Sequence, residues 1–267
     1  MVGLGLIGGS FALALKRARP ETTLVGVDTD QLTLQRALGR GVVTFAGPDL
    51  DAARTADVVV LAVPVLAMRP LLQGLAGFPG TVTDVASTKA EVMEWAAAAG
   101  VDLVGGHPMC GREASGLEGA DPDLFQGAPW VLTRAEPGIE DLVTAVGARP
   151  VVMDAATHDQ LVAGVSHAAF VLSAAYVLSV SGAADWPEAS RLAASGFRDM
   201  SRLAAGDPEM YAGIARTNRR RLGEALDRFE AALARVRRHL DQDDPRLAEL
   251  FEDARDARRR WVDGKRP

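Results

Sequence analysis

Hydrophobic and polar positions follow two different patterns along this chain. From Met1 to about Asp154, short runs rich in β-branched residues alternate with helix-like stretches such as residues 9–17 and 89–99. Such alternation is typical of a parallel sheet whose strands are joined by crossover helices. The predicted strands cover residues 23–28, 57–63, 81–85, 103–106, 129–133 and 150–154.

The pattern becomes purely helical after Asp154. Residues 159–180 read as one long helix, and an apolar stripe in steps of four and three residues predicts an amphipathic helix further on. A last helix begins after Asp244 and Pro245. The stripe consists of Leu222, Leu226, Phe229, Leu233, Val236 and Leu240. We therefore expect an α/β domain over residues 1–154 and an all-helical domain over residues 155–267, with the stripe used for core or dimer packing.

The long helix is apolar enough to raise the question of a membrane. Between Gln160 and Trp186 the only Asp, Glu, Lys or Arg is Asp185. The stretch also contains His167, several serines and many alanines, and it lacks flanking basic residues and an aromatic belt. A helix that is apolar all round is also typical of the buried centre of a helical domain. We expect this second arrangement and no membrane partner.

Charge and cysteine content exclude further classes of protein. Lys and Arg number 29 against 35 Asp and Glu, a net charge of −6, whereas a nucleic-acid-binding domain carries a basic surface. Cys110 is the single cysteine, so no disulfide framework forms within the chain. A reducing compartment fits this content, and no secretory signal peptide is evident. We expect a cytoplasmic protein without a nucleic-acid partner.

A glycine-rich loop at the start of the chain indicates dinucleotide binding. Gly3, Gly5 and Gly8 form a GxGxxG pattern, and the helix-like "SFALALKRA" follows. The three glycines would allow a tight turn, close approach of a pyrophosphate and close packing of helix on strand. Asp28 ends the next strand twenty residues after Gly8. A carboxylate there binds the ribose hydroxyls of NAD and disfavours the 2′-phosphate of NADP.

The loop has one departure from this pattern. Only Met1 and Val2 precede the first glycine, where a strand of several residues is usual. Either the strand starts upstream of Met1 or the central strand is very short. The alternative to a cofactor loop is a plain glycine turn followed by a solvated aspartate at a strand end.

Three polar clusters follow at strand ends and in the long helix. They are "DVASTK" around Ser87, "GGHPMCGREASG" around His107 and "VSHAAF" around His167. The glycines and proline beside His107 indicate a strand that turns into a loop. Because ligands of open α/β sheets bind beyond the carboxyl ends of the strands, we expect Ser87 and His107 near the reactive end of the cofactor, with His167 facing them.

Each of these residues also has a structural interpretation. Ser87 could cap a helix, with Glu91 as its partner. His107 and His167, each taken alone, are more often structural residues. Arg198 and Arg202 are spaced i and i+4, so they would share a helix face, where two guanidinium groups suit carboxylates but could also pair with nearby aspartates. A metal site is not expected, because no second group of ligands accompanies His107 and Cys110.

Taken together, the motifs resemble those of the prephenate dehydrogenase family of tyrosine biosynthesis. The matching segments extend from Gly3 to about Ala204, and they include "GLGLIGGS", "ADVVVLAVP", "VTDVASTK", "GGHPMCGREASG", "VSHAAF" and "GFRDMSRLA". The resemblance implies a Rossmann dinucleotide-binding domain followed by a helical dimerisation domain. It also implies NAD-dependent oxidative decarboxylation of prephenate to 4-hydroxyphenylpyruvate and carbon dioxide by a homodimer.

The resemblance assigns roles to individual residues. His107 matches the histidine that accepts the hydroxyl proton of the substrate, and Ser87 matches a serine that holds this hydroxyl, the histidine and the nicotinamide. The implied substrate-binding residues are Arg202, His167, Arg198, Glu113 and Arg112. The implied cofactor-binding residues are Gly3, Gly5, Leu6, Ile7, Gly8, Asp28, Val63, Pro64 and Ser87.

The loop after His107 departs from the family at Cys110 and Arg112, where the family often has small residues. Arg112 would add a carboxylate contact or change the substrate that fits, and Glu113 matches an acid that gates the pocket. Three alternatives stay open: an arogenate dehydrogenase, a 3-hydroxyacid or imine reductase on the same plan, and a non-catalytic dinucleotide-sensing dimer. Asp28 and the basic loop favour NAD and prephenate.

Overall fold

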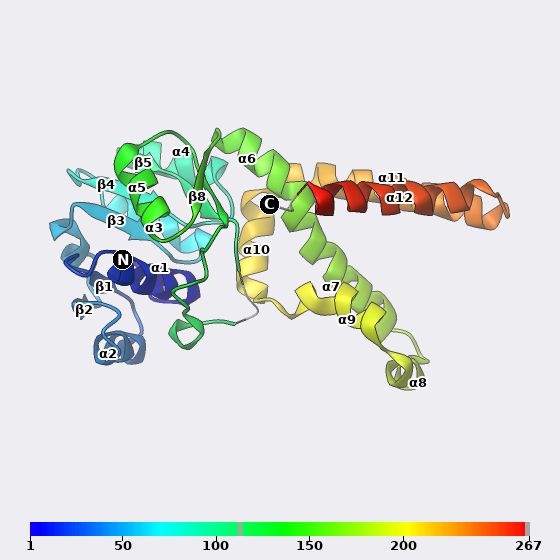
Figure 1. Ribbon diagram of the computed structural model, residues 1–267, viewed down its shortest axis with the longest axis horizontal. Helices are drawn as coiled ribbons and strands as arrows, with labels where there is room; N and C mark the ends of the chain where they lie inside the picture. The colour runs from blue at the N-terminus through cyan, green and yellow to red at the C-terminus, as the bar shows by residue number, and fades with distance from the viewer. Residues whose placement is uncertain (112–113, 265–267) are drawn as a thin grey trace. The chain divides into compact units, whose positions relative to one another are not determined.

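The structure is a computed structural model that describes residues 1–111 and 114–264. The chain forms two compact units, Met1–Arg219 and Arg220–Pro267. The first unit contains a sheet with helices and the polar clusters, and the second is a pair of helices (Figure 1).

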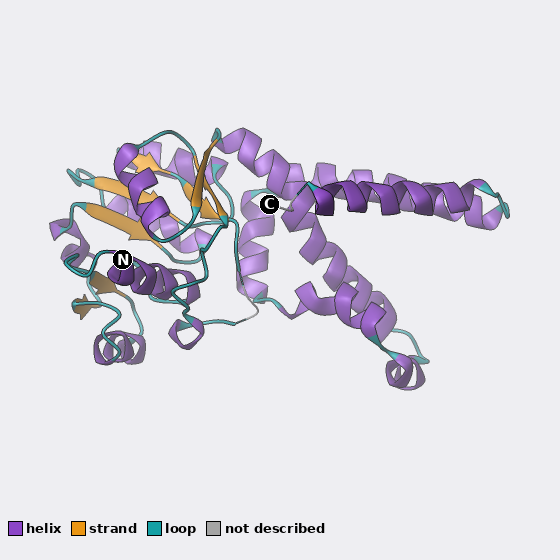
Figure 2. Cartoon of the chain, viewed as in Figure 1, coloured by secondary structure: helices purple, strands orange, loops and turns teal. Residues whose placement is uncertain are grey.

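The main sheet of the first unit is parallel throughout. β1 pairs with β2, and β3 pairs with β4, which pairs with β5. Figure 2 shows these strands among the helices of the unit. The strands are β1 (Val25–Val27), β2 (Phe45–Gly47), β3 (Val58–Leu61), β4 (Thr81–Asp84) and β5 (Leu103–Val104). The predicted parallel sheet is confirmed here, and β2 is an edge strand that the hydrophobic pattern did not indicate.

Val2 joins the two parts of this sheet. It forms parallel bridges to Val27 of β1 and to Leu61 of β3. Its amide donates to the carbonyl of Val60 at 2.9 Å, and its own carbonyl accepts from the amide of Ala62 at 2.7 Å. The backbone around Val2 therefore lies between β1 and β3 and is hydrogen-bonded to both at the point where the glycine loop begins.

Helices cover both faces of the sheet, each with its own apolar core. One core gathers around Leu4, Phe11 and Trp130 and includes residues of α1 and α5. The other gathers around Leu61 and Leu72 and includes residues of α3 and α4. The helices are α1 (Leu6–Ala18), α2 (Gln31–Gly39), α3 (Met68–Gly74), α4 (Ala90–Ala99) and α5 (Pro137–Ala145), with short 3-10 turns at Leu50–Thr55, Val65–Ala67 and Leu117–Gly119. Two covered faces explain why β3, Val58–Leu61, is apolar throughout.

A second, smaller sheet carries His107 and corrects two expectations. It consists of β6 (Gly106–Pro108), β7 (Pro129–Leu132) and β8 (Arg149–Val152). β6 and β7 are antiparallel, so the α/β half is not parallel throughout. The strand expected at 103–106 is split at Gly105, and His107 lies inside β6 opposite Val131 instead of in a loop.

The two glycines before His107 explain this split. A Cβ on Gly105 would lie 2.8 Å from Cγ2 of Thr133, and a Cβ on Gly106 would meet the carbonyl oxygen of Asp84. The amide of Gly106 donates to Oδ1 of Asp84 at 3.0 Å. Only residues without a side chain let the backbone pass this close to β4 and change sheets. The glycines therefore place His107 beside the end of β4.

The long apolar helix is present from Ala155 to Ser181, but it is interrupted. α6 (Ala155–Val162) leads into a π-helical turn at Ala163–His167, and α7 (Ala168–Ser181) follows. By length and composition this helix could cross a membrane, and 33% of its most apolar window is buried within the described chain. Its exposed apolar residues include Leu161, Val165 and Leu178.

The rest of the first unit packs along α7 and returns to the sheet. The hydroxyl of Ser173 donates to the carbonyl of Met200 at 2.8 Å and accepts from the amide of Ala204 at 3.0 Å, which fixes the α9 region on α7. The elements are α8 (Trp186–Ala189), α9 (Ser195–Ser201) and α10 (Pro208–Thr217), with 3-10 turns at Ser190–Leu192 and Arg202–Ala205. The side chain of Asp207 caps α10 at its start by accepting from the amides of Glu209 and Met210.

The second unit is a helical hairpin of α11 (Arg219–Asp241) and α12 (Arg246–Asp263) (Figure 1). The carboxylate of Asp244 closes the turn, because it accepts from Arg246 and pairs with Nδ1 of His239 at 2.9 Å. These hydrogen bonds hold the pKa of Asp244 below its usual range. Of the predicted stripe, Phe229, Leu233 and Leu240 are exposed, whereas Leu222 is buried and Leu226 and Val236 are half-buried. Phe251 and Trp261 of α12 are exposed as well.

The crossing at Gly106 gives a test of this fold. In Gly106→Ala the new Cβ would press on the carbonyl of Asp84 and lie 3.0 Å from Nε1 of Trp130, both in the core. Overpacking of this kind costs about 1–3 kcal/mol, and we expect a lower urea midpoint of unfolding. Gly138→Ala on α5 is the matched control, because its Cβ meets nothing within 4 Å. Equal midpoints for the two variants would contradict the crossing.

Candidate active site

The glycine loop has the geometry that a dinucleotide requires. Gly3 has φ +91° and lies against the carbonyl of Ala62, and a Cβ on Gly8 would fall on the carbonyl oxygen of Gly3. These two positions exclude side chains for structural reasons. A Cβ on Gly5, in contrast, would meet no atom within 4 Å, so open space lies beside its backbone. Packing within the protein therefore does not require a glycine at position 5, and the absence of a side chain there leaves room for a ligand.

The start of α1 faces this space without a side-chain cap. Gly5 is the N-cap, and the first turn begins with Leu6, Ile7 and Gly8. The first amides of a helix have no partner within it and carry a partial positive charge, which favours an anionic group such as a pyrophosphate. The residues present thus fit the phosphates of a dinucleotide.

Asp28 lies at the end of β1 and lines an adjoining cleft of about 510 Å³. Gly3, Gly5, Val63 and Pro64 line the same cleft. One oxygen of Asp28 accepts from the amide of Leu4 at 2.8 Å, which ties the strand end to the glycine loop. The other accepts from the amide of Asp30 at 3.0 Å. Asp28 therefore supports the loop and also presents an acid to the cleft, as a ribose site requires.

The loop after β4 does not use Ser87 as a helix cap. α4 begins after Lys89, which makes no side-chain cap bond. Instead, the carboxylate of Asp159 on α6 accepts from the amides of Lys89 at 2.8 Å and Ala90 at 2.9 Å. The capping interpretation of Ser87 is wrong, because an acid from a distant helix occupies that place. Ser87 is half-buried and its side chain is left for another role.

His107 belongs to a buried chain of side chains. Its Nδ1 lies 2.8 Å from Nε2 of His158, and Nδ1 of His158 lies 2.8 Å from Oδ1 of Asp159. His107 is 8% exposed and His158 is fully buried. Burial lowers the pKa of His107 well below 6.5, and the side chains of His158, Lys89 and His167 act in the same direction. His107 is thus neutral at neutral pH and able to accept a proton.

His167 is held in the same cluster by Asn218. The amide nitrogen of Asn218 lies 3.1 Å from Nδ1 of His167 and donates to the backbone carbonyl of Asp159 at 2.8 Å. Burial lowers the pKa of His167 to about 4, while the charge of Asp159 acts in the opposite direction. Nε2 of His167 is buried and has no hydrogen-bond partner among the described residues. This nitrogen is available to a polar group that enters from the site.

The π-helical turn explains how His158 and His167 meet. Nine α-helical residues rotate a side chain by about 900°, which places the second residue about half a turn away from the first. A π-helical turn contains about one residue more than an α-helical turn. With this extra residue, the angle between the two side chains around the helix axis falls from about 180° to about 80°. The turn at Ala163–His167 therefore brings both imidazoles toward one side of the helix.

A buried ion pair supports the loop that carries Ser87. Nζ of Lys89 contacts Oδ1 of Asp84, and both side chains are fully buried. Burial raises the pKa of Asp84 and lowers that of Lys89, while their attraction opposes both shifts. Oδ2 of Asp84 has no partner among the described residues. The pair has no net charge whichever partner holds the shared proton, and it fixes the end of β4 beside His107.

The arginines predicted to bind substrate, Arg198 and Arg202, belong to α9 and to the turn that follows it. Arg198 is on α9, but Arg202 begins the 3-10 turn that follows, so the two do not share one α-helix. Both are exposed. The hydrogen bonds described for His107, His158 and His167 go to other partners. Arg112 and Glu113, also predicted to bind substrate, lie outside the described residues.

Four residues of this cluster escaped the sequence analysis as functional residues: Lys89, His158, Asp159 and Asn218. His158 and Asp159 form the dipeptide "HD" nine residues before His167, and Asn218 ends "YAGIARTN". A histidine and an acid at the start of an apolar helix could have been recognised in the sequence as candidate functional residues. Their pairing with residues 50 to 70 positions earlier could not be predicted from the sequence, because it depends on the packing of α6 on α4.

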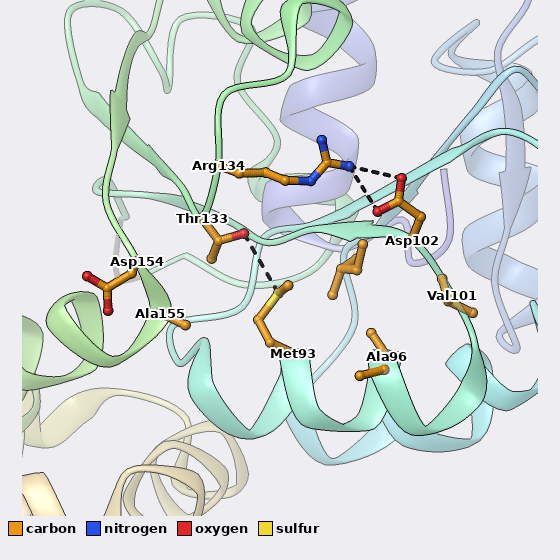
Figure 3. A pocket seen from close by; sticks show the side chains of 10 residues that line it. Met93, Ala96, Val101, Asp102, Thr133, Arg134, Asp154 and Ala155 are labelled. Carbon is orange, nitrogen blue, oxygen red and sulfur yellow. Dashed lines mark hydrogen bonds and ion pairs between the residues drawn. The ribbon is translucent and has the colours of Figure 1, made fainter.

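A second cavity, of about 340 Å³, is lined by α4, the start of β5 and the segments that follow β7 and β8 (Figure 3). Its walls are mainly apolar and include Met93 and Ala96, with an ion pair between Arg134 and Asp102 at 3.0 Å. None of the predicted site residues lines it. The glycine loop and the histidine cluster are therefore the features that point to chemistry.

Comparison with known proteins also identifies the first half of the chain as a nucleotide-binding domain. Residues 11–152 match the prephenate dehydrogenase nucleotide-binding domain, and residues 154–253 match the prephenate dehydrogenase dimerization domain. The chain is 33% identical over 260 residues to a prephenate dehydrogenase of Lactococcus lactis, covering 94% of this chain and 73% of that protein.

Two solved structures have the same fold over nearly the whole chain. One is a Synechocystis arogenate dehydrogenase, with a TM-score of 0.82 and 34% identity, covering 97% of this chain and 98% of that one. The other is a prephenate dehydrogenase from A. aeolicus in complex with hydroxyphenyl propionate and NAD+, with a TM-score of 0.91 and 26% identity, covering 97% of this chain and 96% of that one.

The fold and the glycine loop define a nucleotide-binding dehydrogenase with a helical second half. More specifically, the chain belongs to the prephenate dehydrogenase family. The predicted family, fold class and enzyme class are confirmed.

The buried ion pair gives a test of the site's framework. Lys89→Met leaves the charge of Asp84 without its partner in a fully buried place, which costs about 3–5 kcal/mol, and we expect a correspondingly lower midpoint in urea unfolding. Arg17→Met is the matched control, because Arg17 and Asp123 are 50% and 62% exposed and such pairs contribute about 0–1 kcal/mol. A Lys89 variant as stable as the control would refute a structural role for the pair.

Proposed function

We propose that this protein is an NAD-dependent prephenate dehydrogenase, in which His107 takes a proton from the hydroxyl of the substrate. The observation that carries the proposal is a neutral, buried histidine at the end of the sheet, in a chain that belongs to this family. The reaction is oxidative decarboxylation of prephenate to 4-hydroxyphenylpyruvate and carbon dioxide.

NAD supplies the acceptor for the hydride when it is bound. Gly3, Gly5 and the first turn of α1 (Leu6, Ile7 and Gly8) would hold its pyrophosphate, and Asp28 its ribose hydroxyls. Val63 and Pro64 line the same cleft, and Ser87 lies in the loop that follows β4. A carboxylate at Asp28 disfavours a 2′-phosphate, which supports NAD over NADP.

His107 acts as the base in this scheme. It accepts the hydroxyl proton on a ring nitrogen, and the electron pair of the O–H bond forms the carbonyl bond while the C–H bond of the same carbon breaks and its hydride leaves to the acceptor. Breaking of the bond to carbon dioxide then returns an electron pair to the ring, and the former carbonyl oxygen becomes the phenolic oxygen and takes back the proton held by His107. Ser87 is proposed to hold the hydroxyl and His107 in register. A histidine is suited to this task only while it is neutral, which burial secures.

The carboxylates of prephenate need cationic partners outside the neutral histidine cluster. Arg202 is the proposed main partner, and Arg198 and Arg112 are further candidates, since a guanidinium can bind a carboxylate with two parallel hydrogen bonds. His167 is proposed to contact the side chain of the substrate through its unpartnered Nε2. Glu113 keeps its predicted role as a gate.

The homodimer is part of the proposal. The helical half matches a dimerization domain, and exposed apolar residues such as Val165, Leu178 and Leu233 would be covered by a second copy. The domain boundary between Asp154 and Ala155 and the cytoplasmic location remain predictions. No part of the proposal requires a nucleic-acid or membrane partner.

A second candidate function is arogenate dehydrogenase. The specific observation in its favour is the 34% identity with the Synechocystis arogenate dehydrogenase over 97% of this chain. Arogenate carries an amino group where prephenate carries a keto group, and the base would serve both substrates.

Substrate profiling tests the proposal. Formation of reduced cofactor is followed at its absorbance band with prephenate or arogenate, each against NAD and NADP. We expect the highest kcat/KM with prephenate and NAD. His107→Asn should retain NAD binding but lose about 10²–10⁴-fold in turnover. A higher kcat/KM with arogenate would favour the second candidate, and absence of turnover with binding of NAD would indicate a dinucleotide sensor.

The pH dependence provides a further test. His107 must be unprotonated to act, and burial lowers its pKa well below 6.5. Therefore kcat/KM should stay constant as pH falls through 6.5 and decline only below it, near the lowered pKa. Because the pKa of His167 is also lowered, to about 4, protonation favours the unfolded state below pH 6.5, and the folded fraction is measured at each pH. A decline centred at 6.5 in folded protein would contradict a buried base.

A further inference from the structure

We propose that Asp159 and His158 fix His107 in the tautomer that carries its proton on Nδ1, so that Nε2 is unprotonated and serves as the base. Neither residue is assigned a part in the reaction by the scheme above. The inference rests on the proposed function in taking His107 as the proton acceptor. Asp159 and His158 are positioning residues, since they act through His107.

The direction of each hydrogen bond follows from the carboxylate. Asp159 accepts two backbone amides of α4, and an ionised carboxylate can only accept. Nδ1 of His158, 2.8 Å from Oδ1 of Asp159, must therefore carry a proton and donate it. A neutral imidazole has one N–H group, so Nε2 of His158 can only accept.

The same rule then determines His107. Its Nδ1 lies 2.8 Å from Nε2 of His158, so Nδ1 of His107 must be the donor. The neutral ring of His107 has no second proton, and Nε2 is left as a base. The opposite arrangement needs an imidazolium at His158, whose side chain is fully buried, and desolvation opposes that charge.

The chain also assists the reaction after proton transfer. When Nε2 of His107 takes the substrate proton, the ring becomes an imidazolium whose Nδ1–H still donates to His158. The carboxylate of Asp159 stands behind that histidine and stabilises the new charge. The logic is that of a base oriented by a second group and a buried acid, as in hydrolytic triads, with one imidazole more.

His167 provides an internal contrast. The backbone carbonyl of Asp159 can only accept, so the nitrogen of the Asn218 side chain must face it. The second N–H of this amide then points to Nδ1 of His167 at 3.1 Å, which must accept. His167 is therefore expected to carry its proton on Nε2, the opposite tautomer to that of His107 and His158.

Nuclear magnetic resonance of the full-length protein tests the tautomers without turnover. The chain has four histidines, so ¹⁵N-histidine labelling gives four ring systems in a long-range ¹H–¹⁵N spectrum, assigned through single His→Asn variants. At pH 7.5 we expect protonated Nδ1 on His107 and His158 and protonated Nε2 on His167. A protonated Nε2 on His107 would overturn the proposal.

Two variants of His158 separate positioning from simple packing. His158→Gln can place an amide oxygen near the former Nε2 and accept from His107, whereas His158→Phe fills the space without an acceptor. We expect His158→Phe to lose about 10–10³-fold in kcat with KM values nearly unchanged, because the base loses its tautomer and its orientation. His158→Gln should recover at least tenfold of that loss. A purely structural role would give both variants the same loss.

The control is His239→Phe, a histidine paired with Asp244 in the helical hairpin, and its turnover should equal that of the unaltered protein. The two proposals fail in different ways. If His107→Asn keeps full turnover, the base is misassigned and the proposed function falls, whatever the spectrum shows. If His107→Asn is inactive but His158→Phe turns over normally, only the positioning chain is refuted. Should both His158 variants unfold, the spectrum of the unaltered protein decides.

Discussion

The carboxylate of Asp159 is the interaction on which the site depends. It is 2% exposed, and a buried charge is tolerated only when its hydrogen bonds are made. Here the two oxygens accept from the amides that begin α4 and from His158, and the positive end of the α4 dipole adds to the stabilisation. One side chain thus joins the loop after β4 to the helix that follows the sheet.

The hydrogen bonds of Asp159 hold together several segments that are distant in sequence. The loop with Ser87 is held at its helix start, His107 is connected through His158, and the backbone of Asp159 receives the side chain of Asn218 on the approach to α11. Thr88 and Thr217 add a buried hydroxyl contact at 2.8 Å between the same segments. A base in a cluster with this many hydrogen bonds keeps a nearly fixed orientation despite thermal motion. Proton transfer requires such a fixed orientation.

The sequence could predict those features whose residues are close together in the chain, and it missed those that depend on contacts between distant segments. The strands at 57–63 and 81–85, the glycine loop and the long helix were identified because their patterns are local. β2 was missed because Phe45–Gly47 is a three-residue edge strand with an exposed Phe45. Ser87 was interpreted as a cap because its local spacing fits one, whereas the actual cap comes from Asp159, about 70 residues later. The π-turn has no signal in the hydrophobic pattern, because the helix is apolar on both sides of it.

The electrostatics of the site explain why so many ionisable groups can be buried together. Asp84 and Lys89 cancel each other, Asp159 faces a helix start, and burial keeps His107 and His167 neutral, so the cluster carries little net charge at neutral pH. A dianionic substrate therefore gains no general attraction from the cluster and must find its cations elsewhere, which is consistent with arginines on a separate element.

The change of charge then occurs at one place, when His107 accepts a proton. Lys89 opposes this new charge and Asp159 favours it through His158. The balance leaves His107 neutral before the reaction and supported during it, which a base at neutral pH needs.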